Sequence, residues 1–281
     1  GRMARPKKML LSCARTRLLT LIALVVRIEA EMAAPMSDTT LWERVHAIKR
    51  KSMLGGMTEL QYRHVFSYVR DNAPQRLLVW GLGFDSQLYA QLNSGGETLF
   101  LEGFMNDFNW AAKRQDRSKT AFAGLNVSLF NASALEATAG TWRRFVQQPF
   151  RAPDRLLPIL SGRPCFDTTI IDSPMGALDS HPGRAVPIYT AASDLQHCAK
   201  MGAYDPPPLR AVAVFVHDAE RATERECSKA FLGDNAANHS FAPARLRAKI
   251  RQKYPRVEAL KTLLHFEYDV HRKQPREQPQ E

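Results

Sequence analysis

The chain has 281 residues, of which 44% are hydrophobic, and a formal net charge of +11. This length suits one large α/β domain with a short extension, and the hydrophobic content excludes a wholly disordered chain. Six basic residues within the first 17 and six more between residues 245 and 256 account for +12, so the rest carries −1 and no nucleic-acid partner is expected.

The first 36 residues form a basic and apolar leader. Its apolar run, Leu18 to Val26, has nine residues, whereas a helix that spans a bilayer needs about 20. The run suits a secretory signal or a membrane-associating anchor, and the alternative is a short amphipathic or disordered leader. We predict a leader over 1–36, a main domain over 37–270 and a disordered, Pro-rich tail over 271–281.

Two amphipathic helices are predicted next, over about 39–51 and 58–71. Apolar residues recur at helical spacing in both, beginning with Leu41 in the first. Thr40 and Glu43 are expected to form a capping box at the start of the first helix. Thr58 and Gln61 are expected to do the same for the second.

Short apolar runs follow, at 77–80, 98–101, 168–171, 211–216 and 263–266. Such runs are typical of strands buried on both faces, as in parallel sheets. Helical patterns lie between them, a weaker strand is expected within 124–130, and the segment 138–164 favours neither form. The alternation predicts an α/β fold, a Rossmann-like, doubly wound and mostly parallel sheet.

A glycine-rich turn follows the first of these runs. Gly81 and Gly83 let the backbone turn sharply and approach a ligand, and a helix beginning near Asp85 or Ser86 offers N–H groups to polar atoms. The second run ends in Glu102, 19 residues beyond Gly83, where a carboxylate can accept hydrogen bonds from both ribose hydroxyls. Together these residues predict a site for the adenosine part of a cofactor.

The turn does not by itself choose the cofactor. Its sequence, GLGFDS, nearly matches the dinucleotide pattern GxGxxG/A, with Ser86 in the third place. NAD carries a pyrophosphate that the Asp85 carboxylate would repel, whereas S-adenosylmethionine carries none. The turn therefore favours S-adenosylmethionine, and an NAD-type oxidoreductase is the weaker alternative.

Acidic and histidine side chains follow the third and fourth runs. Asp172 follows one, and His217 and Asp218 follow the other, so all three are expected where ligands bind in open α/β sheets. Either His217 is a general base that Asp172 orients, or Asp172 and Asp218 bind a divalent metal ion that lowers the pKa of a hydroxyl group. The structural alternative is that His217 and Asp218 cap the next helix while Asp172 holds a turn.

Basic residues offer two candidate contacts for an acidic substrate. Arg184 lies near the start of a predicted helix, where a cation is unfavourable for the helix dipole, so it is a candidate for bidentate binding of a carboxylate. The alternative is an ordinary surface arginine. The basic residues of 245–256 form either a solvated helix face or a face that binds an acidic glycan.

Cysteine and asparagine motifs leave the compartment open. The four cysteines show no CxxC or zinc-finger spacing, so no structural zinc site is expected, and their number does not fix the redox compartment. Sequons begin at Asn126, Asn131 and Asn238. They permit N-glycosylation in a secretory lumen and also arise by chance.

Several segments, taken together, resemble one family in sequence and in order. They are WGLGFDSQLYAQLN, TLFLEG, IIDSPMG, HPGRAVPIYTAA, VFVHDAER and LLHFEY. They are similar to the plant polysaccharide-biosynthesis domain family, which includes glucuronoxylan 4-O-methyltransferases, arabinogalactan methyltransferases and irregular-xylem proteins. The resemblance covers about Thr58 to Tyr268. The chain departs from it at Phe84, where the family often has His, at Gly103, where it often has an acidic residue, and at Ala219, where it has Val.

The resemblance implies a methyltransferase fold that uses S-adenosylmethionine and methylates glucuronic acid residues of a cell-wall polysaccharide such as xylan. It also implies an acidic polysaccharide as acceptor and a location at the lumenal face of the Golgi apparatus, behind an N-terminal anchor. The alternative within the same family is a non-catalytic protein that supports xylan assembly through binding.

Overall fold

The structure of the chain is a computed structural model that describes residues 36–52, 57–103, 125–152, 160, 165–173, 182–201, 212–233, 237–239 and 263–268. The chain divides into two compact units, 1–37 and 38–281, and every helix and strand given below belongs to the second. The predicted leader apart from residue 36, the predicted tail and the basic cluster at 245–256 lie outside the described residues. Among the helices that the structure describes, none is long and apolar enough to cross a membrane.

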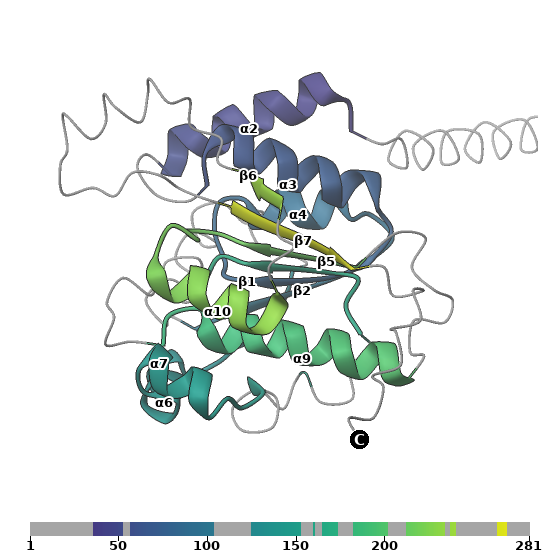
Figure 1. Cartoon of the computed structure of the whole chain (residues 1–281). Helices are drawn as coiled ribbons and strands as arrows, with labels where there is room; N and C mark the ends of the chain where they lie inside the picture. The colour runs from purple at the N-terminus through teal and green to yellow at the C-terminus, as the bar shows by residue number, and fades with distance from the viewer. Residues whose placement is uncertain are drawn as a thin grey trace, which may run out of the picture. The chain divides into compact units, whose positions relative to one another are not determined.

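A seven-stranded sheet with the order β3-β2-β1-β4-β5-β7-β6 forms the centre of the second unit (Figure 1). The first five strands in this order are parallel, and β7 is antiparallel to both β5 and β6. The prediction of an α/β fold with a doubly wound, mostly parallel sheet is therefore confirmed. The strands are β1 (Arg76–Trp80), β2 (Glu97–Glu102), β3 (Asn126–Leu129), β4 (Thr168–Ile171), β5 (Val212–Val216), β6 (Ala237–His239) and β7 (Leu263–Tyr268).

Helices cover both faces of this sheet (Figure 1). The first three helices lie on one face and the other four lie on the opposite face, so the central strands are buried on both sides. This double cover explains why β4 and β5 are continuous buried runs instead of alternating patterns. The helices are α2 (Asp38–Ser52), α3 (Glu59–Asp71), α4 (Ser86–Leu92), α6 (Ala132–Ala139), α7 (Trp142–Gln147), α9 (Ala185–Met201) and α10 (Ala222–Leu232).

The two predicted capping boxes have different outcomes. At α3, the Thr58 hydroxyl accepts the Gln61 N–H and the Gln61 side chain accepts the Thr58 N–H, which confirms that box. At α2, the helix already begins at Asp38, so Thr40 lies inside it and the predicted box with Glu43 is wrong.

Two strands differ from expectation. The apolar run at 263–266 forms β7, as expected, but β7 runs antiparallel to its neighbour β5. The short strand β6 was not predicted, since three residues without an apolar run give no strand pattern. The ambiguous segment 138–164 contains the end of α6 and all of α7, whose Phe145 packs edge-on against aromatic rings of α9 and α10.

Candidate functional site

The carboxyl ends of β1, β2, β4 and β5 bring the predicted site residues together. Backbone hydrogen bonds extend the ladder one residue past these strands: Asp172 N–H donates to the Trp80 carbonyl at 3.0 Å, and His217 N–H donates to the Ile171 carbonyl at 3.1 Å. The chain moves from β1 to β2 in one direction and from β4 to β5 in the other, so β1 and β4 flank the switch point. Ligands bind at this point in open α/β sheets.

The glycine turn lies beside the end of β4. Gly81 has φ +119, a value that favours glycine, and a Cβ atom there would lie 3.1 Å from the Ser173 Cβ. At the other side of the turn, Gly83 N–H donates to the Ser86 hydroxyl at 2.9 Å. The turn therefore has a fixed shape and passes close to the β4 end, as a backbone that approaches a ligand must.

Glu102 and the glycine turn are in direct contact. The Leu82 N–H donates to Glu102 Oε2 at 2.8 Å, and Glu102 is 2% exposed. The sequence spacing predicted this proximity, and the structure places the carboxylate against the turn. Its role in binding ribose stays a prediction.

Asp85 is a buried carboxylic acid at the start of α4. It serves as the N-cap residue without a side-chain capping bond, and the Tyr62 hydroxyl of α3 donates a hydrogen bond to its carboxylate. Burial, and then repulsion by Asp172, raise the pKa of Asp85 to about 6. A carboxylate kept away from water beside a second one is characteristic of functional sites, because stability alone would not favour it.

The Asp172, His217 and Asp218 side chains form one group. His217 Nδ1 lies 2.5 Å from Asp172 Oδ1, and His217 Nε2 lies 3.3 Å from Asp218 Oδ1. The imidazole is thus held between two carboxylates, one from each of two neighbouring strand ends. Their ligand-type atoms all lie within 4.8 Å of one another.

Arg184 contacts this group from within the protein. It is 2% exposed, so its interpretation as a surface arginine is wrong. Its guanidinium donates to the Asp172 carbonyl at 2.7 Å, to Asp218 Oδ2 at 3.1 Å and to the His217 carbonyl. Both terminal nitrogens are thereby engaged within the protein. A substrate carboxylate would have to displace these bonds, so the predicted substrate role has no support in this geometry.

The helix-capping alternative for His217 and Asp218 is also wrong. The N-cap residue of α10 is Arg221, and no side chain caps it. Asp218 instead has φ +58 and accepts from Arg221 Nη2 at 2.9 Å as well as from Arg184. Strain of this kind in a non-glycine residue is typical of functional sites.

Sequence reasoning missed three participants, Tyr62, Arg221 and Glu224. Tyr62 follows the Thr58 cap by one helical turn, but nothing in the sequence places it against Asp85. Glu224 is fully buried behind Arg184, and burial raises its pKa. Glu224 lies in the first turn of α10, where an acidic residue is ordinarily explained by its favourable interaction with the helix dipole.

The two departures beside the turn have different structural settings. A Cβ atom at Gly103 would lie 2.4 Å from Phe130 Cζ, so Phe130 fills the space that a side chain there would need. Phe130 in turn packs edge-on against Trp80 of β1. Phe84 is half-buried in the turn itself and offers no titratable group.

Comparison with known proteins finds a family and several relatives that are similar to the chain in sequence. The family described as IRX15/IRX15L/GXM matches residues 60–132 and 163–244, more than half of the chain. Glucuronoxylan 4-O-methyltransferase 1 of Arabidopsis thaliana is 32% identical over 170 residues, which are 57% of this chain and 56% of that protein. Arabinogalactan O-methyltransferase 1 of the same plant is 28% identical over 59% of this chain and 58% of its own length. The chain thus aligns with little more than half the length of these relatives.

Among solved structures, the chain is similar to O-methyltransferases of low sequence identity. The Bacillus cereus enzyme, in complex with SAH, matches with a TM-score of 0.38 and 10% identity, over 87% of this chain and 97% of its own. The O-methyltransferase TomG from Streptomyces achromogenes, in complex with SAM, matches with the same TM-score and identity over 87% and 96%.

Proposed function

Because the chain belongs to the IRX15/IRX15L/GXM family, we propose that it transfers a methyl group from S-adenosylmethionine to a hydroxyl group of a polysaccharide. The observation that carries the proposal is the meeting, at one switch point, of the glycine turn with Glu102 and of the group Asp172, His217 and Asp218. The first set suits a nucleoside and the second suits proton transfer. Within this proposal, the acceptor is a glucuronic acid residue of a cell-wall polysaccharide such as xylan, as the relatives' names suggest.

The donor side fits the residues present. Glu102 is held against the turn, where its carboxylate could accept hydrogen bonds from ribose hydroxyls, and Gly81 lets the turn pass close to the end of β4. Asp85 and Asp172 make this region electronegative, which suits a cationic donor and opposes a pyrophosphate. When bound, S-adenosylmethionine supplies an activated methyl group.

On the acceptor side, Asp172 is the group that a substrate reaches. Its side chain is 25% exposed, whereas that of His217 is 2% exposed. In this arrangement Asp172 takes the hydroxyl proton and passes it to His217 Nδ1, 2.5 Å away. The Asp218 carboxylate lies beside the other ring nitrogen and stabilises the positive charge that the imidazole then carries. His217 remains the base of the original prediction, and Asp172 becomes its contact with the acceptor.

A divalent metal ion fits the same group less well. Asp218 Oδ2 already accepts from two guanidinium groups, those of Arg184 and Arg221, and Asp172 Oδ1 contacts His217. A cation among these atoms would be repelled by both arginines, so we derive no step through it. Chelation tests the predicted metal ligands Asp172 and Asp218: loss of transfer on chelation, restored by Mg²⁺ or Mn²⁺, would establish a metal requirement.

The proposed location is the lumenal face of the Golgi apparatus. The bond between Cys165 and Cys198 supports it, because disulfides persist in oxidising compartments. Residues 1–36 are proposed to direct secretory entry and membrane association. Fusion of this segment to a reporter tests the proposal, since a uniformly cytosolic reporter would show that the segment lacks a working signal.

Calorimetry with S-adenosylmethionine, S-adenosylhomocysteine and NAD tests the proposed function most cheaply. We expect the first two to bind and NAD not to bind. Binding of NAD alone would favour an oxidoreductase. A second candidate, a non-catalytic assembly factor, is favoured by Phe84 and Gly103, the two departures beside the turn. It becomes the better account if the protein binds the donor or a glycan but methylates no uronate-bearing polysaccharide.

A further inference from the structure

The three sequons of the chain begin in or close to the two terminal strands of the sheet. Asn126 begins β3, Asn131 is the N-cap residue of α6 two residues after β3 ends, and Asn238 lies within β6. In the sheet order β3-β2-β1-β4-β5-β7-β6, these two strands are the terminal ones. Within the described residues, the asparagines that begin no sequon are Asn72 and Asn93, and they lie at the ends of α3 and α4.

The side chains at the β3 edge are accessible. Asn126 and Asn131 are both exposed. Asn131 also caps α6, but it does so with Oδ1, which accepts the Ala134 N–H at 2.9 Å. The atom that carries an N-linked glycan is Nδ2, so the cap and a glycan are compatible on the same side chain.

The β3 strand carries neither the charged residues nor the proline that often protect an edge strand. Its four residues, Asn126 to Leu129, include no charged residue and no proline, and Leu129 is 42% exposed. Among the described strands, only β2 pairs with β3. An open backbone edge with an apolar side chain favours association with a second chain. A bulky hydrophilic group would prevent such contact.

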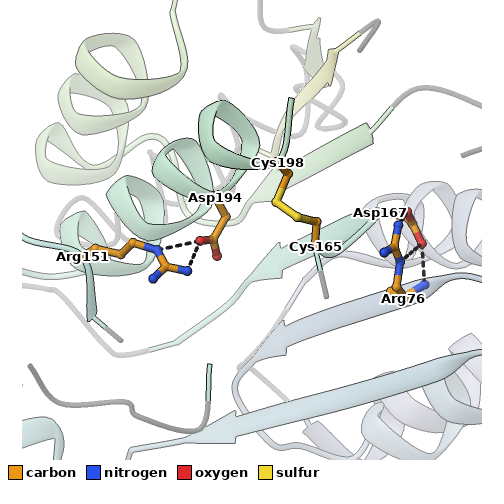
Figure 2. The surroundings of a disulfide bond; sticks show 6 residues. All are labelled: Arg76, Arg151, Cys165, Asp167, Asp194 and Cys198. Atoms are coloured by element: carbon orange, nitrogen blue, oxygen red, sulfur yellow. Dashed lines mark hydrogen bonds and ion pairs between the residues drawn. A yellow bond between two sulfur atoms is a disulfide. The ribbon is translucent and has the colours of Figure 1, made fainter. Parts of the chain in front are cut away.

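The disulfide indicates a compartment in which glycans are added. Cys165 precedes β4 and Cys198 lies on α9, and Figure 2 shows their bond near two ion pairs, Arg76–Asp167 and Arg151–Asp194. Both cysteines are buried. A buried pair of this kind forms where proteins fold under oxidising conditions, and in eukaryotic cells that compartment is also the one in which sequons are glycosylated.

We propose that Asn126 and Asn131 carry N-linked glycans that cover the β3 edge of the sheet. In the reaction, the Nδ2 atom forms a bond to C1 of an oligosaccharide carried on a polyisoprenyl diphosphate. The bond from C1 to the diphosphate breaks, the lipid diphosphate leaves with the electron pair, and the amide loses one proton to the solvent. The proposal rests on the lumenal location proposed above.

The test is expression of the full chain in eukaryotic cells behind a heterologous, cleavable secretory signal, so that entry does not depend on residues 1–36. Treatment with peptide-N-glycosidase F should shift the mobility of the parent protein. Ser128→Ala and Ser133→Ala should each remove one glycan, and the double variant should remove both. The variant Ser133→Ala leaves the Asn131 cap intact, so a loss of the glycan cannot be a loss of the helix.

Mass spectrometry after enzymatic deglycosylation in ¹⁸O-water assigns each site, because a formerly glycosylated Asn becomes a labelled Asp. Formation of the Cys165–Cys198 bond, read by alkylation without reduction, confirms that the chain folded in the lumen. A folded, disulfide-bonded chain with both asparagines unmodified would overturn the proposal. Such a result would leave the methyltransferase proposal intact, since donor binding by that same protein is measured separately.

The cover of the edge has its own readout. The double variant Ser128→Ala, Ser133→Ala lacks both glycans without adding a charge, and its sedimentation should shift toward larger species as protein concentration rises. A double variant that stays monomeric at concentrations where the parent is also monomeric would overturn the role of the glycans at the edge.

Discussion

Asp85→Asn is expected to stabilise the fold while weakening donor binding. The Asp85 carboxyl group is buried, and its pKa rises from 3.8 to about 6 in the folded chain. The folded state therefore keeps a proton that the unfolded chain has lost between these two pH values. As pH rises through this window the folded state loses stability, and above about pH 6 the loss is complete.

The magnitude follows from the size of the pKa shift. At about 1.4 kcal/mol per pKa unit, the raised pKa of Asp85 costs the native state about 3 kcal/mol at pH 7.5, where the carboxyl group is ionised, and less than about 1 kcal/mol at pH 4, where the folded chain keeps it protonated. Asparagine has nearly the same shape and carries no charge, so Asp85→Asn should recover these amounts. Its side-chain oxygen can still accept the hydrogen bond from Tyr62.

Urea unfolding of the parent and the variant at several pH values between 4 and 7.5 measures the difference. Taking the difference at each pH removes the contribution of titrating groups that do not interact with Asp85. Tyr62→Phe is the matched control: it removes a hydrogen bond that lowers the pKa of Asp85, so the fold should lose stability at pH 7.5 and lose less at pH 4. A difference between parent and Asp85→Asn that does not change with pH would refute the reasoning. Donor affinity that is unchanged in Asp85→Asn would remove Asp85 from the cofactor site.

Three further changes test other parts of the structure. Glu102→Gln should weaken S-adenosylmethionine binding by about 1–3 kcal/mol, because the ribose hydroxyls lose a charged acceptor; unchanged affinity by calorimetry would exclude Glu102. Arg184→Met should destabilise the fold by about 3–5 kcal/mol, since it removes the buried guanidinium that joins the Asp172 and His217 carbonyls to the Asp218 carboxylate, and a urea midpoint equal to that of the parent would show that the network is dispensable. Joint replacement of Cys165 and Cys198 by Ala opens a link across a separation of 33 residues and should cost about 3–4 kcal/mol; thermal unfolding unchanged by the replacement would contradict this.

The sequence predicts the framework of the site well, because that framework depends on strand ends. Apolar runs locate β1, β2, β4 and β5. The parallel arrangement then places Gly81, Glu102, Asp172 and His217 together at the carboxyl ends of these strands. The orientation of β7 could not be predicted in this way, because an apolar run has no direction.

The remainder of the site depends on contacts between distant segments. Arg184 has the sequence position of a surface residue, yet its guanidinium is buried because two strand ends offer it carbonyl and carboxylate oxygens. Tyr62 meets Asp85 only once α3 has packed beside the turn. Side-chain packing also makes Asp172 more exposed than His217. The sequence could therefore name the residues of the group but not the one that an acceptor reaches.

Methyl transfer from S-adenosylmethionine, labelled in the methyl group, to glucuronoxylan tests the central claim most directly. The full chain should incorporate label into the polysaccharide. His217→Asn should lower the rate on the order of 10²–10⁴-fold, as expected when a general base is lost, while calorimetry shows donor affinity close to that of the parent. Incorporation by His217→Asn and Asp172→Asn at the parent rate would contradict the assignment of the site, and a parent that binds the donor yet labels no uronate-bearing glycan would contradict the proposed reaction.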